Sequence, residues 1–142
     1  MNPTLEKFGY PATSVIELDH WAILVRRDQV TLGSLVLAAK ADATRYSQLP
    51  SEAFVEQGEA VRFIEHALEA FVAYEKINYL MLMMVDPNPH FHVIPRYSGA
   101  RTWHGIDFPD HGWPKAPRLD AAIELNDDQI ASLVQNLSDN FH

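Results

Sequence analysis

Two apolar runs separated by a short proline-rich break constrain the fold of this chain more than any other feature. Residues 77–85 are nearly all apolar, a pattern typical of a central β-strand. Asp86-Pro87-Asn88-Pro89 interrupts the run, and residues 91–94 resume it before Pro95, which predicts the end of that strand or an edge position. Because the link between the two runs is short, they predict neighbouring antiparallel strands.

The rest of the chain alternates short strands with two helices. Residues 14–18, 21–26 and 34–39 read as strands, with a turn ending at Gly33. Pro50-Ser51-Glu52 opens an amphipathic helix over residues 51–74, in which apolar side chains recur at helical spacing. Residues 98–118, rich in glycine, proline and tryptophan, predict an ordered loop.

A short final helix is predicted after Asn126. Asn126 can cap it, Gln129 can reach back to the cap, and Ile130 begins its apolar stripe. The order of strands, long helix, strands, loop and helix predicts one α+β domain with a mainly antiparallel sheet.

Composition excludes several function classes. The 142 residues include 11 Lys and Arg against 19 Asp and Glu, a net charge of -8, and no basic cluster exceeds Arg26-Arg27. A nucleic-acid-binding surface is therefore not expected, because neutralising phosphates requires clustered cations. No apolar run reaches the roughly 20 residues of a membrane span. The absence of cysteine rules out thiolate chemistry, and together with the lack of a secretory signal pattern it is compatible with the cytoplasm, where we expect the protein to act.

The residues that carry chemistry lie where the second apolar run begins. In an extended chain Asn88, His90 and His92 share one face, with the two imidazoles about 7 Å apart at their bases, given a rise of about 3.3 Å per residue. Such a pair can address one phosphoryl group, one ring attacking phosphorus and the other donating to an oxygen. It can equally hold a metal ion if His104, His111 or Asp86 supplies further ligands. The third interpretation is that His90 and His92 are two half-exposed polar residues without a function.

Residues 88–97, Asn-Pro-His-Phe-His-Val-Ile-Pro-Arg-Tyr, resemble the signature of the histidine triad (HIT) superfamily. In that signature histidines alternate with apolar residues and are followed by two apolar residues and often Pro-Arg. Residues 76–79 resemble the strand start of bacterial members, and residues 31–37 resemble a turn and strand that usually hold Pro-Gly-His. The helix at 51–74 also falls at the family's position.

The resemblance implies a HIT-like single domain over residues 1–142, with the motif core at 14–98 and a C-terminal loop and helix at 99–142. The fold would be a mainly antiparallel sheet of about five strands with a long helix and a short C-terminal helix, commonly paired as a homodimer. Its members hydrolyse or transfer nucleoside monophosphates from nucleotide conjugates. Dinucleoside polyphosphates or nucleoside phosphoramidates are thus the expected small-molecule partners, and the covalent step needs no cofactor or metal.

By the same resemblance His90 is the nucleophile that forms a nucleotidyl-histidine intermediate, and His92 contacts the phosphate oxygens. Asn88 stands at the first triad position, where its main-chain carbonyl would orient the nucleophile.

Four further residues are candidates for nucleotide binding. Met84 stands where many members carry a nucleotide-binding asparagine after a glycine, and Ser34 occupies an earlier family histidine position. Asn78 either lines the nucleotide pocket or caps a strand, and Arg96 either balances phosphate charge or is an exposed cation at a strand end. The alternatives to an enzyme are a catalytically weak nucleotide-binding module and a metal-binding protein built on the His-x-His pair.

Overall fold

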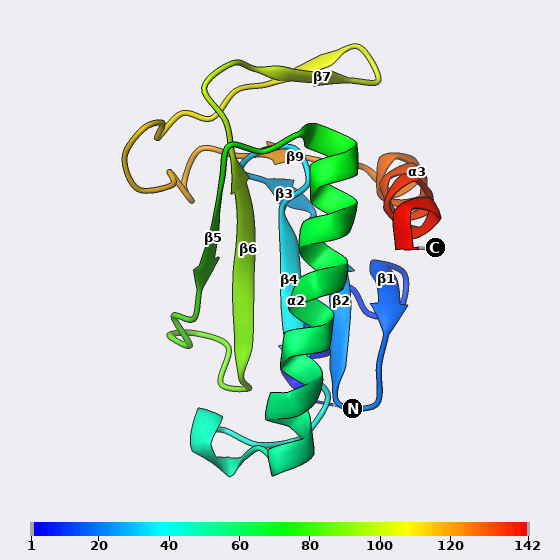
Figure 1. Cartoon of the computed structure of the whole chain (residues 1–142), viewed down its shortest axis with the longest axis vertical. Helices are drawn as coiled ribbons and strands as arrows, with labels where there is room; N and C mark the ends of the chain where they lie inside the picture. The colour runs from blue at the N-terminus through cyan, green and yellow to red at the C-terminus, as the bar shows by residue number, and fades with distance from the viewer. Residues whose placement is uncertain (1, 142) are drawn as a thin grey trace.

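The computed structural model describes residues 2–141, Phe141 by its backbone alone, and centres on a five-stranded sheet (Figure 1). Every neighbouring pair in the sheet is antiparallel, and the order is β1-β2-β4-β6-β5. The strands are β1 (Ser14–Glu17), β2 (Trp21–Val25), β4 (Leu35–Ala39), β5 (Lys76–Leu80) and β6 (His90–Arg96). The prediction of a mainly antiparallel sheet of about five strands is confirmed.

The long helix α2 (Ser51–Val72) covers one face of this sheet (Figure 1). Its buried stripe repeats at helical spacing and packs against side chains from β2, β4 and β6; the stripe consists of Ala53, Ala60, Ile64, Ala67, Leu68 and Val72. The last residue of the helix is Val72, because the next residue, Ala73, adopts φ 47°. The helix is therefore two residues shorter than the predicted range of 51–74. Within residues 2–141, no helix is both long and apolar enough to cross a membrane.

A short N-terminal helix, α1 (Pro3–Lys7), covers part of the opposite face. Leu5 packs there on Ala22 and Leu24 of β2 and on Val36 and Ala38 of β4. The sequence analysis did not predict this helix, although its start carries a recognisable signal. Asn2 caps it by accepting a hydrogen bond from the Leu5 amide at 2.9 Å, and Pro3 occupies its first turn.

Strand β5 differs from its prediction in both place and length. It is an edge strand rather than a central one, and its pairing with β6 ends at Leu80, opposite His92. Residues 81–85 leave the sheet as an irregular segment in which Met83 has φ 48°. An apolar run does not distinguish a buried strand from a strand followed by an exposed apolar loop, and here Met84 and Val85 are exposed.

Strand β6 continues through Pro95 to Arg96, so Pro95 does not end the strand, whereas the predicted alternative of an edge position agrees with the pairing. The pairing of β6 with β4 stops at Val93, opposite Leu35, whereas its pairing with β5 extends to Arg96. Pro95 therefore lies in a part of β6 that has a strand neighbour on one side only, where the loss of a backbone N–H is tolerated.

The C-terminal part surrounds one end of the sheet (Figure 1). Residues 98–118 are not all loop, because β7 (Arg101–Trp103) and β8 (Ile106–Phe108) form a hairpin within them. β3 (Asp28–Gln29) pairs with β9 (Ile123–Glu124), and helix α3 (Asp127–Ser138) packs beside β1 and α2. The predicted capping box of α3 is confirmed, with Asn126 and Gln129 in reciprocal hydrogen bonds at 2.8 and 2.9 Å. The short helices η1 (Tyr46–Gln48) and η2 (Asp139–Phe141) complete the chain.

Candidate active site

His90 and His92 project from the face of β6 that points away from α2. The intervening Phe91 and the following Val93 pack into the core with α2, so strand alternation places the two histidines on the other side. Their ring centroids are 5.2 Å apart, with the ring planes at 81°. The two imidazoles therefore lie on one side of a single strand, as the alternation in the sequence predicted, and both line one cavity.

The backbone carbonyl of Asn88 orients the His90 ring. The distance from His90 Nδ1 to the Asn88 oxygen is 2.7 Å. A carbonyl oxygen only accepts hydrogen bonds, so Nδ1 carries a proton, and in the neutral form of the ring the lone pair lies on Nε2. Within residues 2–141, no hydrogen bond occupies Nε2. The arrangement thus selects the tautomer in which Nε2 is the nucleophilic nitrogen.

The side chain of Asn88 does not line the cavity but anchors its own backbone. Its Oδ1 accepts from the Thr4 hydroxyl at 2.9 Å, and its Nδ2 donates to the Ala43 carbonyl at 2.8 Å. The Asn88 amide also donates to the Thr4 oxygen at 3.3 Å. Asn88 is 2% exposed, so these bonds satisfy a buried carboxamide and hold the carbonyl that orients His90.

His92 stays neutral at ordinary pH. Burial lowers its pKa to about 4, and the positive charge of Arg26 adds to the effect. Arg26 Nε donates a long hydrogen bond of 3.4 Å to His92 Nδ1, which leaves the proton of His92 on Nε2. His92 can therefore donate one hydrogen bond to a phosphoryl oxygen as a neutral ring, but it is not a protonated acid near pH 7.

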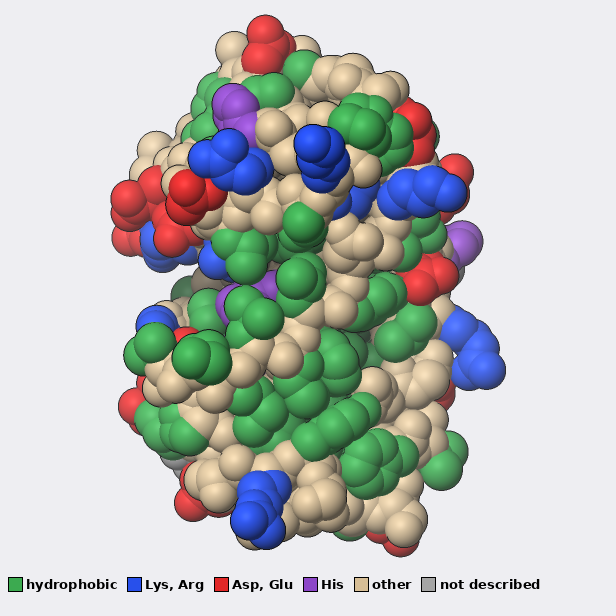
Figure 2. Space-filling view, turned by 90° about the vertical axis from the view of Figure 1, so that its left-hand side faces the viewer, with side chains coloured by type: hydrophobic (Ala, Val, Ile, Leu, Met, Phe, Trp, Pro, Cys, Tyr) green, Lys and Arg blue, Asp and Glu red, His purple; other side chains and the backbone are tan. Residues whose placement is uncertain are grey.

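The cavity that both histidines line has a volume of about 340 Å³. Its charged lining consists of Lys7, Arg26, Asp28 and Asp86, beside the histidines. Its apolar lining comes mainly from the loop after β5, together with Phe8 and Leu119: Leu82, Met83, Met84 and Val85. Figure 2, which shows the β5 side of the molecule, displays histidine side chains set into a hollow with hydrophobic surface around it. Such a site suits a ligand with an anionic group and an uncharged organic part.

The N-terminal helix contributes contacts that sequence reasoning missed. The Phe8 ring lies 5.6 Å from the His90 ring and 5.7 Å from the His92 ring, centroid to centroid. Lys7 forms an ion pair with Asp86 at 3.1 Å, which ties the helix to the loop after β5. The sequence analysis also did not place Arg26 at the site. The only feature that could have indicated its role is a charged residue directly after the apolar strand β2.

Two of the predicted nucleotide-binding residues, Asn78 and Arg96, lie in a separate place. They line a cavity of their own, together with Lys76 and residues 113–116. Arg96 is 3% exposed and donates to both carboxylate oxygens of Asp110, at 2.6 and 3.0 Å. Its other contacts are Asn78 Oδ1 and the Lys115 carbonyl, each at 2.8 Å. Four of the five N–H donors of the guanidinium are thus used inside the protein.

The structure separates the remaining two candidates. Ser34 is fully buried in the turn before β4, where its hydroxyl donates to the Thr31 carbonyl at 2.8 Å, and it does not line the histidine cavity. Met84 does line that cavity but is 86% exposed. Met83 has φ 48°, a conformation that favours glycine, and by the resemblance noted in the sequence it stands at the glycine that precedes the family's asparagine.

The part of the chain that the structure describes contains no group of three or more histidine and carboxylate side chains able to hold a metal ion. Asp86 lines the histidine cavity but is paired with Lys7. His104 stacks on Trp103, with ring centroids 3.8 Å apart, and contacts Ser132. The set of ligands suggested for a metal site is therefore not assembled around His90 and His92.

Comparison with solved structures identifies the class of fold. A histidine triad protein from Bradyrhizobium japonicum matches with a TM-score of 0.71 at 17% identity, over 100% of this chain and 97% of that one. A histidine triad protein from Sinorhizobium meliloti matches with a TM-score of 0.69 at 20% identity, over 99% and 95% of the two chains. The diadenosine triphosphate hydrolase of Plasmodium falciparum matches with a TM-score of 0.66 at 11% identity, over 91% and 76%.

The chain therefore has the histidine triad fold, an α+β fold whose five-stranded sheet carries a long helix and a C-terminal helix. No family model and no curated protein sequence matches it. The likeness to known proteins is therefore one of fold.

Proposed function

We propose that this chain is a nucleotide-conjugate hydrolase or nucleotidyltransferase of the histidine triad type, acting through a covalent nucleotidyl-His90 intermediate. The observation that carries the proposal is the 2.7 Å contact between His90 Nδ1 and the Asn88 carbonyl, which leaves Nε2 as a free nucleophile in a cavity. The likeness to histidine triad proteins, among them a diadenosine triphosphate hydrolase, supports the same reaction class.

The reaction has two displacements at the α-phosphorus. In the first, the Nε2 lone pair of His90 forms a P–N bond while the bond from phosphorus to the leaving group breaks, and the leaving group takes the electron pair. In the second, a water oxygen forms a P–O bond, the P–N electron pair returns to Nε2, and the water proton passes to solvent. The proton stays on Nδ1 throughout and is donated to the Asn88 carbonyl in a hydrogen bond, which stabilises the cationic phosphorylated ring.

His92 has the role of a hydrogen-bond donor to the non-bridging phosphoryl oxygens. Because it is neutral, it stabilises charge that develops on these oxygens without releasing a proton. The apolar part of the cavity lining, from Leu82 to Val85, is the proposed place of the nucleoside. None of the proposed steps uses a metal ion or a cofactor.

Trapping the intermediate tests the proposal. An adenine nucleotide conjugate labelled at the α-phosphate, mixed with the protein and quenched rapidly with alkali, should leave label on a peptide containing His90. The His90→Ala variant should show neither label nor turnover, and His66→Ala, which changes a histidine on α2 across the sheet, should behave as wild type. Micromolar nucleotide binding with no label and no product would instead identify a catalytically weak binding module. Stoichiometric zinc retained through dialysis would favour a metal-binding protein.

The proposed enzyme is a homodimer. Strand β5 has a neighbour on one side only, and exposed large apolar side chains occur just beyond it, among them Leu82 and Val85. An unpaired strand edge with adjacent apolar surface favours association with a second chain. Light scattering at micromolar concentration should give twice the mass of one chain, and a monomeric mass at that concentration would contradict the expectation.

A further inference from the structure

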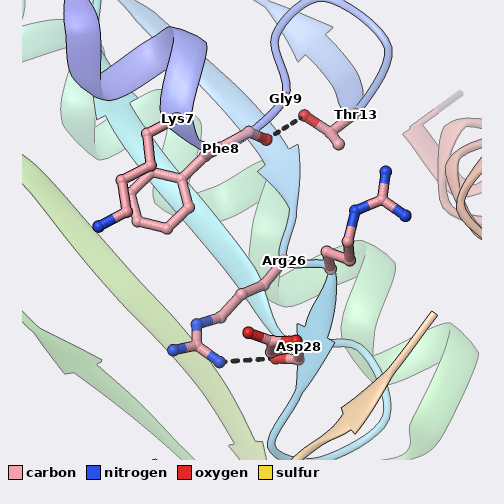
Figure 3. A pocket seen from close by; sticks show the side chains of 7 residues that line it. Lys7, Phe8, Gly9, Thr13, Arg26 and Asp28 are labelled. Atoms are coloured by element: carbon pink, nitrogen blue, oxygen red, sulfur yellow. Dashed lines mark hydrogen bonds between the residues drawn. The ribbon is translucent and has the colours of Figure 1, made fainter. Parts of the chain in front are cut away.

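A second cavity, of about 200 Å³, shares part of its lining with the histidine cavity, and Figure 3 shows this second cavity from close by. Four residues line both of them: Lys7, Phe8, Arg26 and Asp28. Figure 3 shows Lys7 and Phe8 extending from α1 on one side and Arg26 reaching from the end of β2 on the other. The two cavities are therefore consecutive spaces that share a wall, and the histidine pair lies on one side of that wall.

Arg26 is the central cation of this wall. Its guanidinium donates to the Asp28 carbonyl at 2.6 Å and to His92 at 3.4 Å. Among residues 2–141 it takes part in no ion pair, although the Asp28 carboxylate is close enough to favour its charge. Burial lowers the pKa of Arg26 because the guanidinium has lost part of its hydration. A partly buried cation without an ion pair binds an incoming anion favourably.

The neighbouring cations, Arg27 and Lys7, differ from Arg26 because each forms an ion pair with a carboxylate. Arg27 also lines the second cavity, but it donates to the Leu125 carbonyl at 2.8 Å and to Asp127 at 2.9 Å. Lys7 is paired with Asp86, although its side chain is about half exposed and can be shared. In a chain with a net charge of -8, this end of the site is locally basic. Positive charge concentrated at a cleft attracts anions despite an acidic molecule around it.

We propose that Arg26, assisted by Lys7, forms a second anion subsite in this cavity, which binds the leaving group of the reaction when that group is itself a phosphate chain. The inference rests on the proposed function for the position of the first phosphoryl group, between His90 and His92. Such a subsite favours nucleotide conjugates of the polyphosphate class over those of the phosphoramidate class, whose leaving group is an amine. The nucleoside then lies against the apolar lining of the histidine cavity, from Leu82 to Val85.

The chemical consequence concerns the first displacement. When His90 attacks, the breaking P–O bond leaves an electron pair on the oxygen of the departing phosphate. Arg26 stabilises this oxyanion with charge-assisted hydrogen bonds, so the leaving group departs without a proton. An amine leaving group needs a proton instead, and Arg26 does not supply one because it remains protonated near pH 7.

Binding of inorganic anions tests the subsite without any turnover. Titration calorimetry with EDTA present should show that wild-type protein binds pyrophosphate about tenfold more tightly than orthophosphate, the factor expected of one charge-assisted hydrogen bond. Arg26→Gln should reduce the ratio to about one, and Arg26→Lys should restore part of it. Arg62→Gln makes the same charge change on an exposed residue of α2, on the other face of the sheet, and should keep the wild-type ratio. Equal affinities in wild type, or an unchanged ratio in Arg26→Gln, would overturn the proposal.

Turnover supplies the second test. The ratio of kcat/KM for diadenosine tetraphosphate to that for adenosine 5′-phosphoramidate should fall at least about tenfold in Arg26→Gln and stay constant in Arg62→Gln. Equal losses on both substrates would show that Arg26 acts only through His92 or through the fold. If Arg26→Gln does not fold, the wild-type protein can be titrated with pyrophosphate while the NMR resonance of the Arg26 side chain is followed. A shift of this resonance would support the subsite, and an unmoved resonance would reject it.

The two proposals fail separately. Without label on His90, the proposed reaction falls, but a pyrophosphate preference that depends on Arg26 would still establish the anion subsite. With label on His90 and no such preference, the reaction stands and the subsite falls.

Discussion

The hydroxyl of Thr4 donates a hydrogen bond of 2.9 Å to the carboxamide oxygen of Asn88, a residue 84 positions later in the chain. Thr4 belongs to the N-terminal helix, whereas Asn88 precedes β6 and presents the carbonyl that orients His90. The N-terminal helix therefore supports the nucleophile through one intermediate residue. Thr4 is a positioning residue, since it contacts neither His90 nor the cavity.

Replacing Thr4 by valine should weaken both folding and the reaction. The change keeps the shape but leaves the buried Asn88 Oδ1 without its donor, which should lower the free energy of unfolding by about 1–3 kcal/mol. A less constrained Asn88 carbonyl should slow labelling of His90 and reduce kcat more than it changes KM. Urea unfolding and quenched-flow labelling measure the two effects. Thr44→Val, at an exposed site before η1, is the matched control, and equal effects of the two changes would argue against a positioning role.

His92 should make stability depend on pH. In the unfolded chain its pKa is about 6.5, and in the fold burial lowers it to about 4. Between these values the unfolded state binds more protons, so stability is lost as the pH falls from about 6.5 towards 4. Between about pH 7.5 and about pH 5, this one residue should cost the fold about 2 kcal/mol.

Urea unfolding of wild type and His92→Gln at both pH values isolates this contribution, because carboxylate effects are common to the two proteins. The difference in stability between the variant and the wild type should shift in favour of the variant at the lower pH. An imidazole resonance of His92 that titrates near 6.5 in the folded protein would contradict the prediction.

The buried pair of Arg96 and Asp110 should be structural. Their side chains are 4% and 1% exposed, and Asp110→Asn leaves the guanidinium without its carboxylate partner. Loss of one member of such a pair should lower the free energy of unfolding by about 3–5 kcal/mol. Asp120→Asn removes the carboxylate of the exposed pair with Arg118 and should leave stability nearly unchanged. Chemical denaturation compares the two variants, and similar stabilities would refute the assignment.

Gly33 should tolerate no side chain. It has φ +95°, and a Cβ built on it would lie 2.9 Å from Cδ2 of the buried Leu68 of α2. Strain and overpacking together predict a loss of about 2–3 kcal/mol for Gly33→Ala. Gly58→Ala, at an exposed position inside α2 where a Cβ would only make an ordinary contact of 3.9 Å with Arg62, should instead stabilise the protein by about 0.5–1 kcal/mol. Opposite signs in urea unfolding would confirm the prediction, and a neutral Gly33→Ala would contradict it.

Local periodicity predicted those parts of the site that depend on one segment. The alternation of His90, Phe91 and His92 placed both imidazoles on one side of a strand, and the structure has them on that side. Helix α2 and the capped start of α3 at Asn126 likewise followed from short-range patterns. Each of these features is decided by neighbours within about one turn or one pleat.

Periodicity failed where the outcome depended on distant partners. The apolar run after Lys76 did not reveal that β5 is an edge strand, because the number of strand neighbours is a property of the whole sheet. Nor did it show that Arg96 pairs with Asp110 and bonds Asn78 in a separate cavity, whereas Arg96 had been a candidate for the phosphate and Asn78 for the nucleotide pocket.

The sequence by itself determined the strand that carries the two histidines, because backbone alternation assigns side chains to faces without reference to the rest of the chain. Only the tertiary structure brought Thr4 to Asn88 and Arg26 to His92. These contacts join residues 84 and 66 positions apart. Their formation depends on how helix and strands pack around a common core, which no local pattern encodes.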